Sequence, residues 1–253
     1  MQLRYGGTRL GRQELFGEIL DDNPGALWNR AQIEATRITL KNLPNLTRIV
    51  VGVDPAVTSG EDSDLTGIVV CGMSNNGHYY VLADNTLKAS PELWAQAVVA
   101  AYELHKADRV IAEVNNGGDL VISVMRQVKA SLPVKKISSS RGKDLRAEPI
   151  SALYEQGRVH HVGYFGSLED QMCEWDKSDK TAKSPDRIDA LVFALTELSE
   201  GSNALNFLSS LAIFCPTCQT PNTRHAITCI SCNTSLGVND VRSPINLVPS
   251  STA

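Results

Sequence analysis

The stretch Arg48-Ile-Val-Val-Gly-Val-Asp54 is an apolar run that ends in a carboxylate. Its continuous apolar character predicts a strand buried on both faces, which we expect to span residues 46–54. The stretch Arg109-Val-Ile-Ala-Glu113 repeats the pattern, and Asp186 and Asp189 open a later apolar stretch with helical character. Carboxylates at strand ends and at a helix start can meet at one rim of a sheet and bind divalent metal.

The order of elements around these acids predicts a mixed sheet. The turn Asn75-Asn76-Gly77 joins two of the first three strands, so the chain opens with an antiparallel meander. Strands and helices then alternate, which implies parallel strands covered by helices. The expected strands are 46–54, 66–73, 78–83, 109–114, 134–138 and 158–162, and the expected helices are 90–106, 118–130, 146–156, 168–175 and 186–198. Three antiparallel strands followed by this alternation is the order of an RNase H-like α/β domain.

Length and composition limit how the chain can be organised. Its 253 residues, 42% hydrophobic and 21% charged, are ordinary for a globular protein of one large or two modest domains. The expected parts are a linker at 1–45 with two helical pieces at 9–20 and 24–37, an RNase H-like domain at 46–202, a connecting segment at 203–210, a small ribbon at 211–236 and a mobile tail at 237–253. Apolar runs are too short for a membrane span, and the N-terminus lacks a signal peptide's apolar core, so we expect a cytoplasmic protein.

Local charge is more informative than the net charge of -4, because net charge sums all surfaces of a protein. Five basic residues lie between Lys135 and Arg146, against the single acid Asp144. This segment is either a solvated loop with a helix start or a surface that contacts phosphates.

The six cysteines form two groups. Cys71 and Cys173 are isolated in apolar surroundings and are predicted to be small buried thiols. The other four follow the spacing C-x2-C-x10-C-x2-C and are Cys215, Cys218, Cys229 and Cys232. Two such pairs present four thiolates tetrahedrally, which suits one structural Zn²⁺ with no open coordination position. Disulfides are the alternative, which a reducing cytosol disfavours.

Phosphodiester cleavage explains why carboxylates would gather at the sheet edge, because it can use two Mg²⁺ or Mn²⁺ ions about 3.5–4 Å apart. Asp54 is expected to bridge the ions and Glu113 to come from the adjacent strand. Asp186 and Asp189 share one face of a helix, so one can bind metal directly and the other through water. Taken singly, each acid could instead have a purely structural role, as a turn residue, a surface residue at a strand end or an acid at a helix start.

The stretch from Gly52 to Leu198 resembles the nuclease domain of the large terminase subunit of tailed bacteriophages. The similar motifs follow the family's order, and they include Gly52-Val-Asp-Pro-Ala56, Ala112-Glu-Val-Asn-Asn-Gly-Gly-Asp119, Ser140-Arg-Gly-Lys-Asp-Leu-Arg-Ala-Glu-Pro149, Tyr154-Glu-Gln-Gly-Arg-Val-His-His161 and Ser184-Pro-Asp-Arg-Ile-Asp-Ala-Leu191. The resemblance implies a metal-dependent endodeoxyribonuclease that cuts concatemeric double-stranded viral DNA. It also implies that Asp54, Glu113, Asp186 and Asp189 are its catalytic metal ligands, and that Arg141, Lys143 and Arg146 meet DNA.

The resemblance implies partners as well, namely an ATPase domain in the full-length protein, the portal protein and the small terminase subunit, in the cytoplasm of the bacterial host. The segments 5–20 and 24–28 look like the region that follows the family's ATPase domain. A phosphate loop G-x-x-x-x-G-K-[ST] is absent, because the only Gly-Lys pair is Gly142-Lys143 and Ile137 stands five residues before Gly142. We therefore expect an excised nuclease portion or a truncated relative, whose zinc ribbon folds a region too small for its own core.

The sequence leaves two other functions open. The chain could be a catalytically silent RNase H-like scaffold that serves as a DNA-binding or packaging adaptor, since fold does not fix function. The complete acid set argues against this, because crowded carboxylates repel one another unless a metal ion relieves the repulsion. A Holliday-junction resolvase or a transposase core would use similar acids, and the motifs within 140–161 favour a terminase.

Overall fold

The computed structural model describes residues 23, 25–56, 64–114, 119–138, 143–176, 185–210, 212–218, 220–223 and 228–236. These residues fall into two compact units that divide between Glu200 and Gly201. Among the helices of the described residues, none combines the length and the apolar character that a membrane crossing needs.

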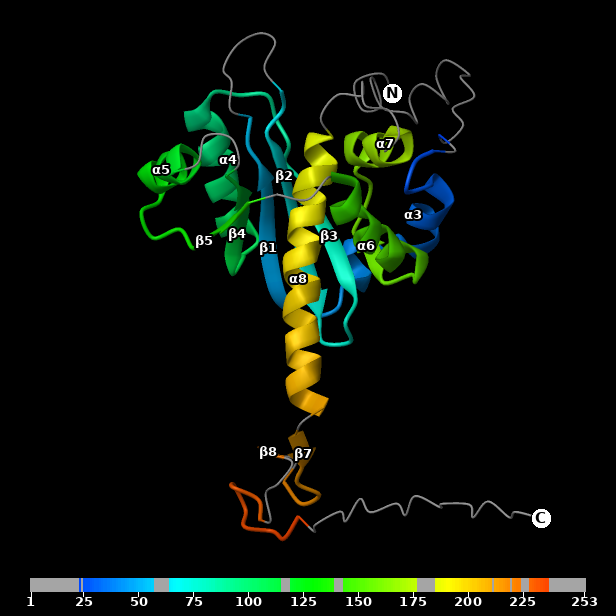
Figure 1. The fold of residues 1–253 in the computed structure, drawn as a ribbon, viewed down its shortest axis with the longest axis vertical. Coiled ribbons are helices and arrows are strands. Elements are labelled where there is room, and N and C mark those ends of the chain that lie inside the picture. Colours follow the sequence, from blue (N-terminus) through cyan, green and yellow to red (C-terminus); the bar gives the residue numbers. More distant parts are fainter. Residues whose placement is uncertain are drawn as a thin grey trace, which may run out of the picture. The chain divides into compact units, whose positions relative to one another are not determined.

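A six-stranded mixed sheet forms the centre of the first unit (Figure 1). In chain order the strands are β1 (Leu46–Asp54), β2 (Gly67–Ser74), β3 (Tyr79–Asp84), β4 (Arg109–Glu113), β5 (Val134–Ile137) and β6 (Val159–His161). They lie side by side in the order β5-β4-β1-β2-β3-β6. The first three are an antiparallel meander, β4 and β5 continue parallel to β1, and β6 lies parallel to β3. The predicted RNase H-like sheet is confirmed.

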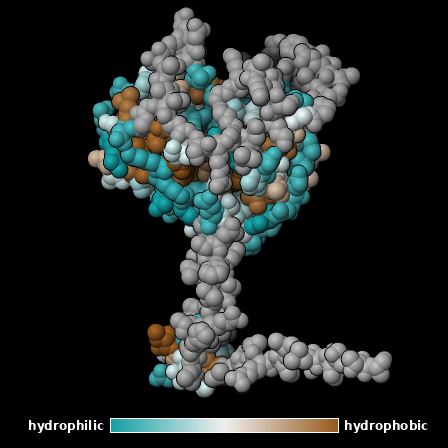
Figure 2. All heavy atoms as spheres, viewed as in Figure 1, coloured by the Kyte–Doolittle hydropathy of each residue, from teal (hydrophilic) through white to brown (hydrophobic). Residues whose placement is uncertain are grey.

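Helices cover both faces of this sheet and bury two apolar clusters of the described residues. One face carries α3 (Arg30–Thr36), α6 (Lys143–Glu155), α7 (Gly166–Glu174) and α8 (Asp186–Ser210), and the other carries α4 (Pro91–Leu104) and α5 (Asp119–Val128). Successive residues of β1 point to opposite faces, so Val50 joins the α8 cluster and Val51 joins the α4 cluster. Burial on both faces explains why β1 reads as a continuous apolar run. Polar side chains lie on the surface between small apolar patches (Figure 2).

The N-terminal segment contributes to the core of the first unit. The predicted helix at 24–37 is shorter in the structure, where α3 begins after Asn29, whose side chain forms a capping box with Gln32. Trp28 and Ile33 are 1% and 0% exposed and pack in the α8 cluster. A short 3-10 helix, η1 (Leu40–Asn42), leads into β1. The predicted helix at 9–20 lies outside the described residues.

Two helices, α6 and α8, extend further than the sequence suggested. α6 begins at Lys143 and contains Pro149, whereas we predicted a start at 146. The segment 203–210, expected to be a connection, is instead the last part of α8, which runs unbroken to Ser210. The predicted helix end at 198 was wrong, because Ser and Asn are only weak helix formers rather than helix breakers and no proline interrupts this segment.

The described residues of the second unit contain a small hairpin. β7 (Ala212–Phe214) pairs antiparallel with β8 (Pro221–Thr223), with Ile213 opposite Asn222. An isolated bridge joins Thr228 to Ser235 around the second cysteine pair. The two cysteine pairs thus lie at the turn of a hairpin and within a small loop, as in a zinc ribbon.

Candidate active site

Two of the predicted acids lie next to each other at the carboxyl ends of two neighbouring strands, β1 and β4. β1 and β4 are parallel, with Val53 opposite Ala112, and Asp54 and Glu113 occupy the next position on each strand. Val50 packs in the α8 cluster, and because side chains alternate along a strand, Asp54 faces α8 as well. The same alternation from Ile111 places Glu113 on that face.

Two glycines let α8 approach the sheet at the end where the acids lie. A Cβ atom at Gly67 would lie 2.0 Å from the carbonyl oxygen of Asp186, and one at Gly52 would lie 2.0 Å from the carbonyl oxygen of Ala190. Such a close approach of two backbones is possible only where a residue has no side chain. Gly67 pairs with Asp54 in the β1–β2 register, so the first turn of α8 lies beside the acid that ends β1.

Hydrogen bonds fix the start of α8. The side-chain oxygen of Gln171, from α7, accepts from the backbone N–H groups of Arg187 and Ile188 at 3.0 and 3.1 Å. The first N–H groups of a helix have no partner within the helix, so Gln171 acts as a cap supplied by a neighbouring helix. The Asp186 carboxylate accepts from the backbone N–H of Leu65 at 3.1 Å. These contacts hold the first turn of α8 beside the β1–β2 connection.

Arg146 reaches the acids from α6. Its guanidinium lies 3.4 Å from Oε1 of Glu113 and 3.9 Å from Oδ1 of Asp189. It also stacks over the ring of Phe193, with 5.2 Å between Cζ and the ring centroid. The side chains of Arg146 and Glu113 are each 17% exposed, and that of Asp189 is 6% exposed. Arg146 therefore links acids from β4 and α8.

The three residues predicted to meet DNA lie in or just before α6. Arg141 is outside the described residues, and at Lys143 the structure describes the backbone alone. Arg146 points toward Glu113 and Asp189, so its guanidinium is directed at the acids. Sequence reasoning treated this arginine as part of a basic surface and missed its place among the acids.

The four acids share one end of the sheet. Their carboxylate oxygens are the ligands that Mg²⁺ and Mn²⁺ prefer. The guanidinium of Arg146, which pairs with Glu113 and Asp189, offsets only one of their four formal negative charges, so the donor set fits divalent cations. Among the described residues, only the four cysteines bring three or more candidate ligand atoms within 4.8 Å of one another. The acids are thus gathered but not closely spaced.

The four paired cysteines converge within the second unit. Their Sγ atoms all lie within 4.8 Å of one another, with 3.4 Å between Cys215 and Cys232 and 3.5 Å between Cys218 and Cys229. All are free thiols, so no disulfide competes with a metal for these sulfurs. Asn222 braces the cluster, because its Oδ1 accepts from the backbone N–H of Ile230 at 2.8 Å. The arrangement fits the zinc ribbon predicted from the spacing.

The two isolated cysteines of the first unit are buried, as predicted. Cys71 and Cys173 are both free and 0% exposed. Burial in apolar surroundings raises the pKa of the Cys71 thiol, so this group stays protonated and unreactive.

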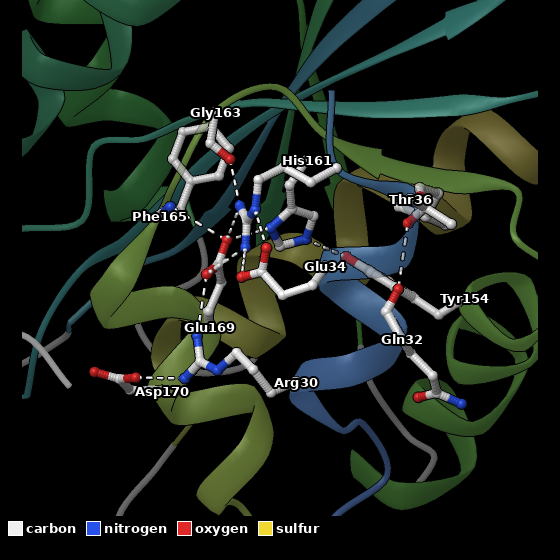
Figure 3. Close-up of polar contacts among 12 residues, drawn as sticks. Arg30, Gln32, Glu34, Thr36, Tyr154, His161, Gly163, Phe165, Glu169 and Asp170 are labelled. Atoms are coloured by element: carbon white, nitrogen blue, oxygen red, sulfur yellow. Dashed lines mark hydrogen bonds and ion pairs between the residues drawn. The ribbon is translucent and has the colours of Figure 1, made fainter. Parts of the chain in front are cut away.

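A second polar cluster, which sequence reasoning missed, is buried between α3, β6 and α7 (Figure 3). Arg37 donates to both carboxylate oxygens of Glu169, at 2.7 and 3.0 Å. His161 lies between Glu169 and Tyr154, with its Nδ1 2.9 Å from the carboxylate and its Nε2 2.8 Å from the hydroxyl. The side chains of His161 and Glu169 are 0% exposed, so the cluster does not face a substrate. We call it the His161 network.

The His161 network has shifted pKa values with clear causes. Burial alone would raise the pKa of Glu169, but hydrogen bonds from His161 and Arg37 outweigh it and lower the pKa to about 2. Burial lowers the pKa of His161, which keeps the ring neutral, and raises the pKa of Tyr154. Glu169 is therefore a buried anion at neutral pH, and it links α7 to Arg37 at the end of α3 and to His161 on β6.

Sheet order, strand register and the placement of the acids define an RNase H-like α/β domain. Within this class, residues 51–198 match the family described as the terminase RNaseH-like domain. The match spans more than half of the chain, and the chain belongs to this family, as the resemblance predicted. No curated protein sequence gives a match.

Solved structures of terminases share the fold. The large terminase nuclease from thermophilic phage G20c is 12% identical with a TM-score of 0.51, over 68% of this chain and 98% of that one. The human cytomegalovirus terminase nuclease domain, soaked with Mn and bound to an inhibitor, is 16% identical with a TM-score of 0.52, over 71% and 97% of the two chains. The large terminase of bacteriophage HK97 is 14% identical with a TM-score of 0.53, over 68% of this chain and 43% of its own. At these identities the likeness shows the fold alone.

Proposed function

We propose that this chain is the metal-dependent endonuclease of a phage DNA-packaging terminase, and that it hydrolyses phosphodiester bonds of concatemeric double-stranded DNA. The main support is that Asp54 and Glu113 occupy equivalent positions at the ends of neighbouring parallel strands, with the acidic start of α8 packed against them. Membership of the terminase RNaseH-like family supports the same function.

Two Mg²⁺ or Mn²⁺ ions held by the acids would supply activation of the attacking water and charge stabilisation of the leaving oxygen. Asp54 at the end of β1 and Glu113 at the end of β4 would hold these ions. Asp186 and Asp189 would complete the site from α8, and the Leu65 N–H orients the carboxylate of Asp186. Burial of these two residues, which are 6% and 4% exposed, strengthens their pull on a cation because water screens them weakly.

The test is nicking of supercoiled plasmid DNA with and without Mn²⁺ or Mg²⁺. Asp54→Asn and Glu113→Gln keep side-chain shape and remove charge, and each should slow cleavage by about 100-fold or more, the scale seen when one group that stabilises a transition state is lost. Glu103→Gln is the control, because Glu103 is 58% exposed and pairs with Lys129 on the other face of the sheet. Undiminished cleavage by both site variants would refute the proposal, and DNA binding without cleavage would favour a silent adaptor.

We propose the partners and the domain limits on the strength of the family relationship. The partners are double-stranded DNA, the ATPase domain of a full-length large terminase, the portal protein and the small subunit, and the place of action is the cytoplasm of the host bacterium. The proposed domain limits are 46–202 for the nuclease and 211–236 for the ribbon, with a linker before and a tail after them. Copurification of the chain with a separately expressed portal or small subunit tests the partners.

We also propose that the four clustered cysteines bind one structural Zn²⁺. The support is the approach of all four sulfurs to within 4.8 Å of one another, with the spacing of two Cys-x-x-Cys pairs. Four thiolates complete a tetrahedral shell, so this ion would stabilise the fold rather than take part in catalysis.

A further inference from the structure

The position of Arg146 bears on how metal would bind to the acidic site, which consists of Asp54, Glu113, Asp186 and Asp189. We propose that Arg146 is an internal counter-cation that competes with divalent ions for Glu113 and Asp189, and thereby sets the metal concentration at which the site becomes occupied. This inference rests on the proposed function. Arg146 acts through the two acids, so it is a positioning residue rather than a catalytic one.

Packing holds the guanidinium in place. Ala147 and Ile150 on α6 are both 2% exposed, so this face of the helix is anchored in the core on the α8 side. The guanidinium stacks on Phe193, which follows Asp189 by four residues on α8 and lies on the same helix face. Arg146 is thus positioned over Asp189 by the same helix that carries the acid.

Electrostatics makes this arginine a competitor of metal. A guanidinium within 4 Å of two carboxylates already supplies part of the positive charge that the acids attract. A divalent ion that binds either carboxylate must share its oxygens with the arginine and lie near a like charge. The arginine and both acids are less than a fifth exposed, so solvent screens this repulsion incompletely. Removing the charge should therefore strengthen metal binding.

Two other roles for Arg146 predict different results. A residue that only holds the acids in place would, when replaced, leave them less ordered and weaken metal binding. A DNA contact would, when replaced, weaken DNA binding and leave metal binding unchanged. The sign of the change in metal affinity separates these roles from competition.

The experiment is calorimetric titration of the full chain with Mn²⁺ in the absence of DNA, using wild type, Arg146→Gln and Arg146→Lys. Loss of binding in Asp54→Asn assigns the measured heat to the acidic site. Arg146→Gln should bind Mn²⁺ about tenfold or more tightly, and Arg146→Lys, which keeps the charge, should stay within about threefold of wild type. Lys129→Gln is the matched control, since it removes a cation paired with Glu103 on the other face of the sheet, and it should leave Mn²⁺ affinity unchanged.

Thermal unfolding gives a second readout that does not depend on cleavage. Without divalent ion, Arg146→Gln should melt below wild type because Glu113 and Asp189 lose a shared partner. Added Mn²⁺ should raise its melting temperature by more than it raises that of wild type. Weaker or unchanged Mn²⁺ affinity in Arg146→Gln overturns this inference alone if wild type binds Mn²⁺. Absence of binding in both proteins overturns the proposed function as well.

Discussion

Replacing Gly52 by alanine should separate α8 from the sheet and impair the acidic site. The added Cβ atom would lie 2.0 Å from the carbonyl oxygen of Ala190 and 3.1 Å from the Cβ of Ala194, whereas an ordinary contact begins at 3.4 Å. The nearest atom belongs to a helix backbone, so it cannot rotate away as a side chain could. The helix must withdraw by about 1.4 Å, the difference between 3.4 and 2.0 Å, or the strand must bend by that amount.

The expected cost of Gly52→Ala follows from this displacement. Overpacking of a core costs about 1–3 kcal/mol, and occasionally more, and a close backbone contact belongs at the upper end of that range. For a unit of this size about 3 kcal/mol lowers the melting temperature by roughly 6–12 °C. Because Asp186 and Asp189 move with α8 relative to Asp54, a misplacement of about 1 Å should also slow plasmid cleavage by about 100-fold.

Circular dichroism melts and plasmid nicking, run on the same preparations, test this prediction. Gly67→Ala, whose Cβ would lie 2.0 Å from the carbonyl oxygen of Asp186, should behave like Gly52→Ala. Ala100→Val is the control, since it adds bulk at an exposed position of α4. If Gly52→Ala melts within about 2 °C of wild type and cleaves DNA at an unchanged rate, these glycines do not determine how closely α8 packs on the sheet.

The remaining predictions concern the His161 network and the cysteine cluster. Glu169→Gln should lower the free energy of unfolding of the first unit by about 3–5 kcal/mol in denaturant, because it leaves Arg37 beside a neutral group in the core. A decrease of less than about 1 kcal/mol would contradict the assignment of Glu169 as a buried anion. The pKa of Glu169 is about 2 in the folded protein against an ordinary 4.5, so the stability that this carboxylate contributes is present above pH 4.5 and is lost as pH falls toward 2. Between these pH values the melting temperature should therefore change less with pH for Glu169→Gln than for wild type. Burial lowers the pKa of His161 below its ordinary 6.5, so its neutral form adds stability above pH 6.5 that is lost on acidification, and a variant without this imidazole should lack that slope. Metal analysis should find about one zinc per chain, lost in Cys229→Ser and retained in Cys71→Ala, and a zinc-free wild type would end the ribbon assignment.

The sequence was sufficient to place the strand-end acids. An apolar run that ends in a carboxylate marks the end of a buried strand. β1 ends at Asp54 as predicted, and β4 ends at Glu113, one residue before the predicted end. The expected adjacency of the two strands came from the RNase H-like order of elements. The βαβ alternation alone does not give it, because β3 and β4, which α4 joins, are not neighbours in the sheet. The register that puts Val53 opposite Ala112 depends on side-chain packing between the helices and the sheet, and only the structure provides it.

The role of Arg146 could not be recognised from local charge. Its basic neighbours suggested a surface segment, and the predicted helix began at 146, whereas α6 begins at Lys143. A signal was nevertheless present, because Arg146, Ile150 and Tyr154 are spaced four apart and the last two are each 2% exposed. A cation that continues the buried stripe of a helix must find an anionic or aromatic partner, and here it finds both.

The His161 network and the acidic site are connected through two helices. α7 carries Glu169, the anion of the network, and two residues later Gln171, which caps the start of α8. α6 carries Tyr154 at one end and Arg146 near the other. A buried ion pair contributes little net stability but strongly favours one arrangement of the elements that share it, because any other arrangement leaves a charge unpaired in the core. The network therefore fixes α7, which caps the first turn of α8, and α6, which carries the guanidinium of Arg146. This explains why Glu169, whose charge is costly to bury, lies away from the acids that it helps to align.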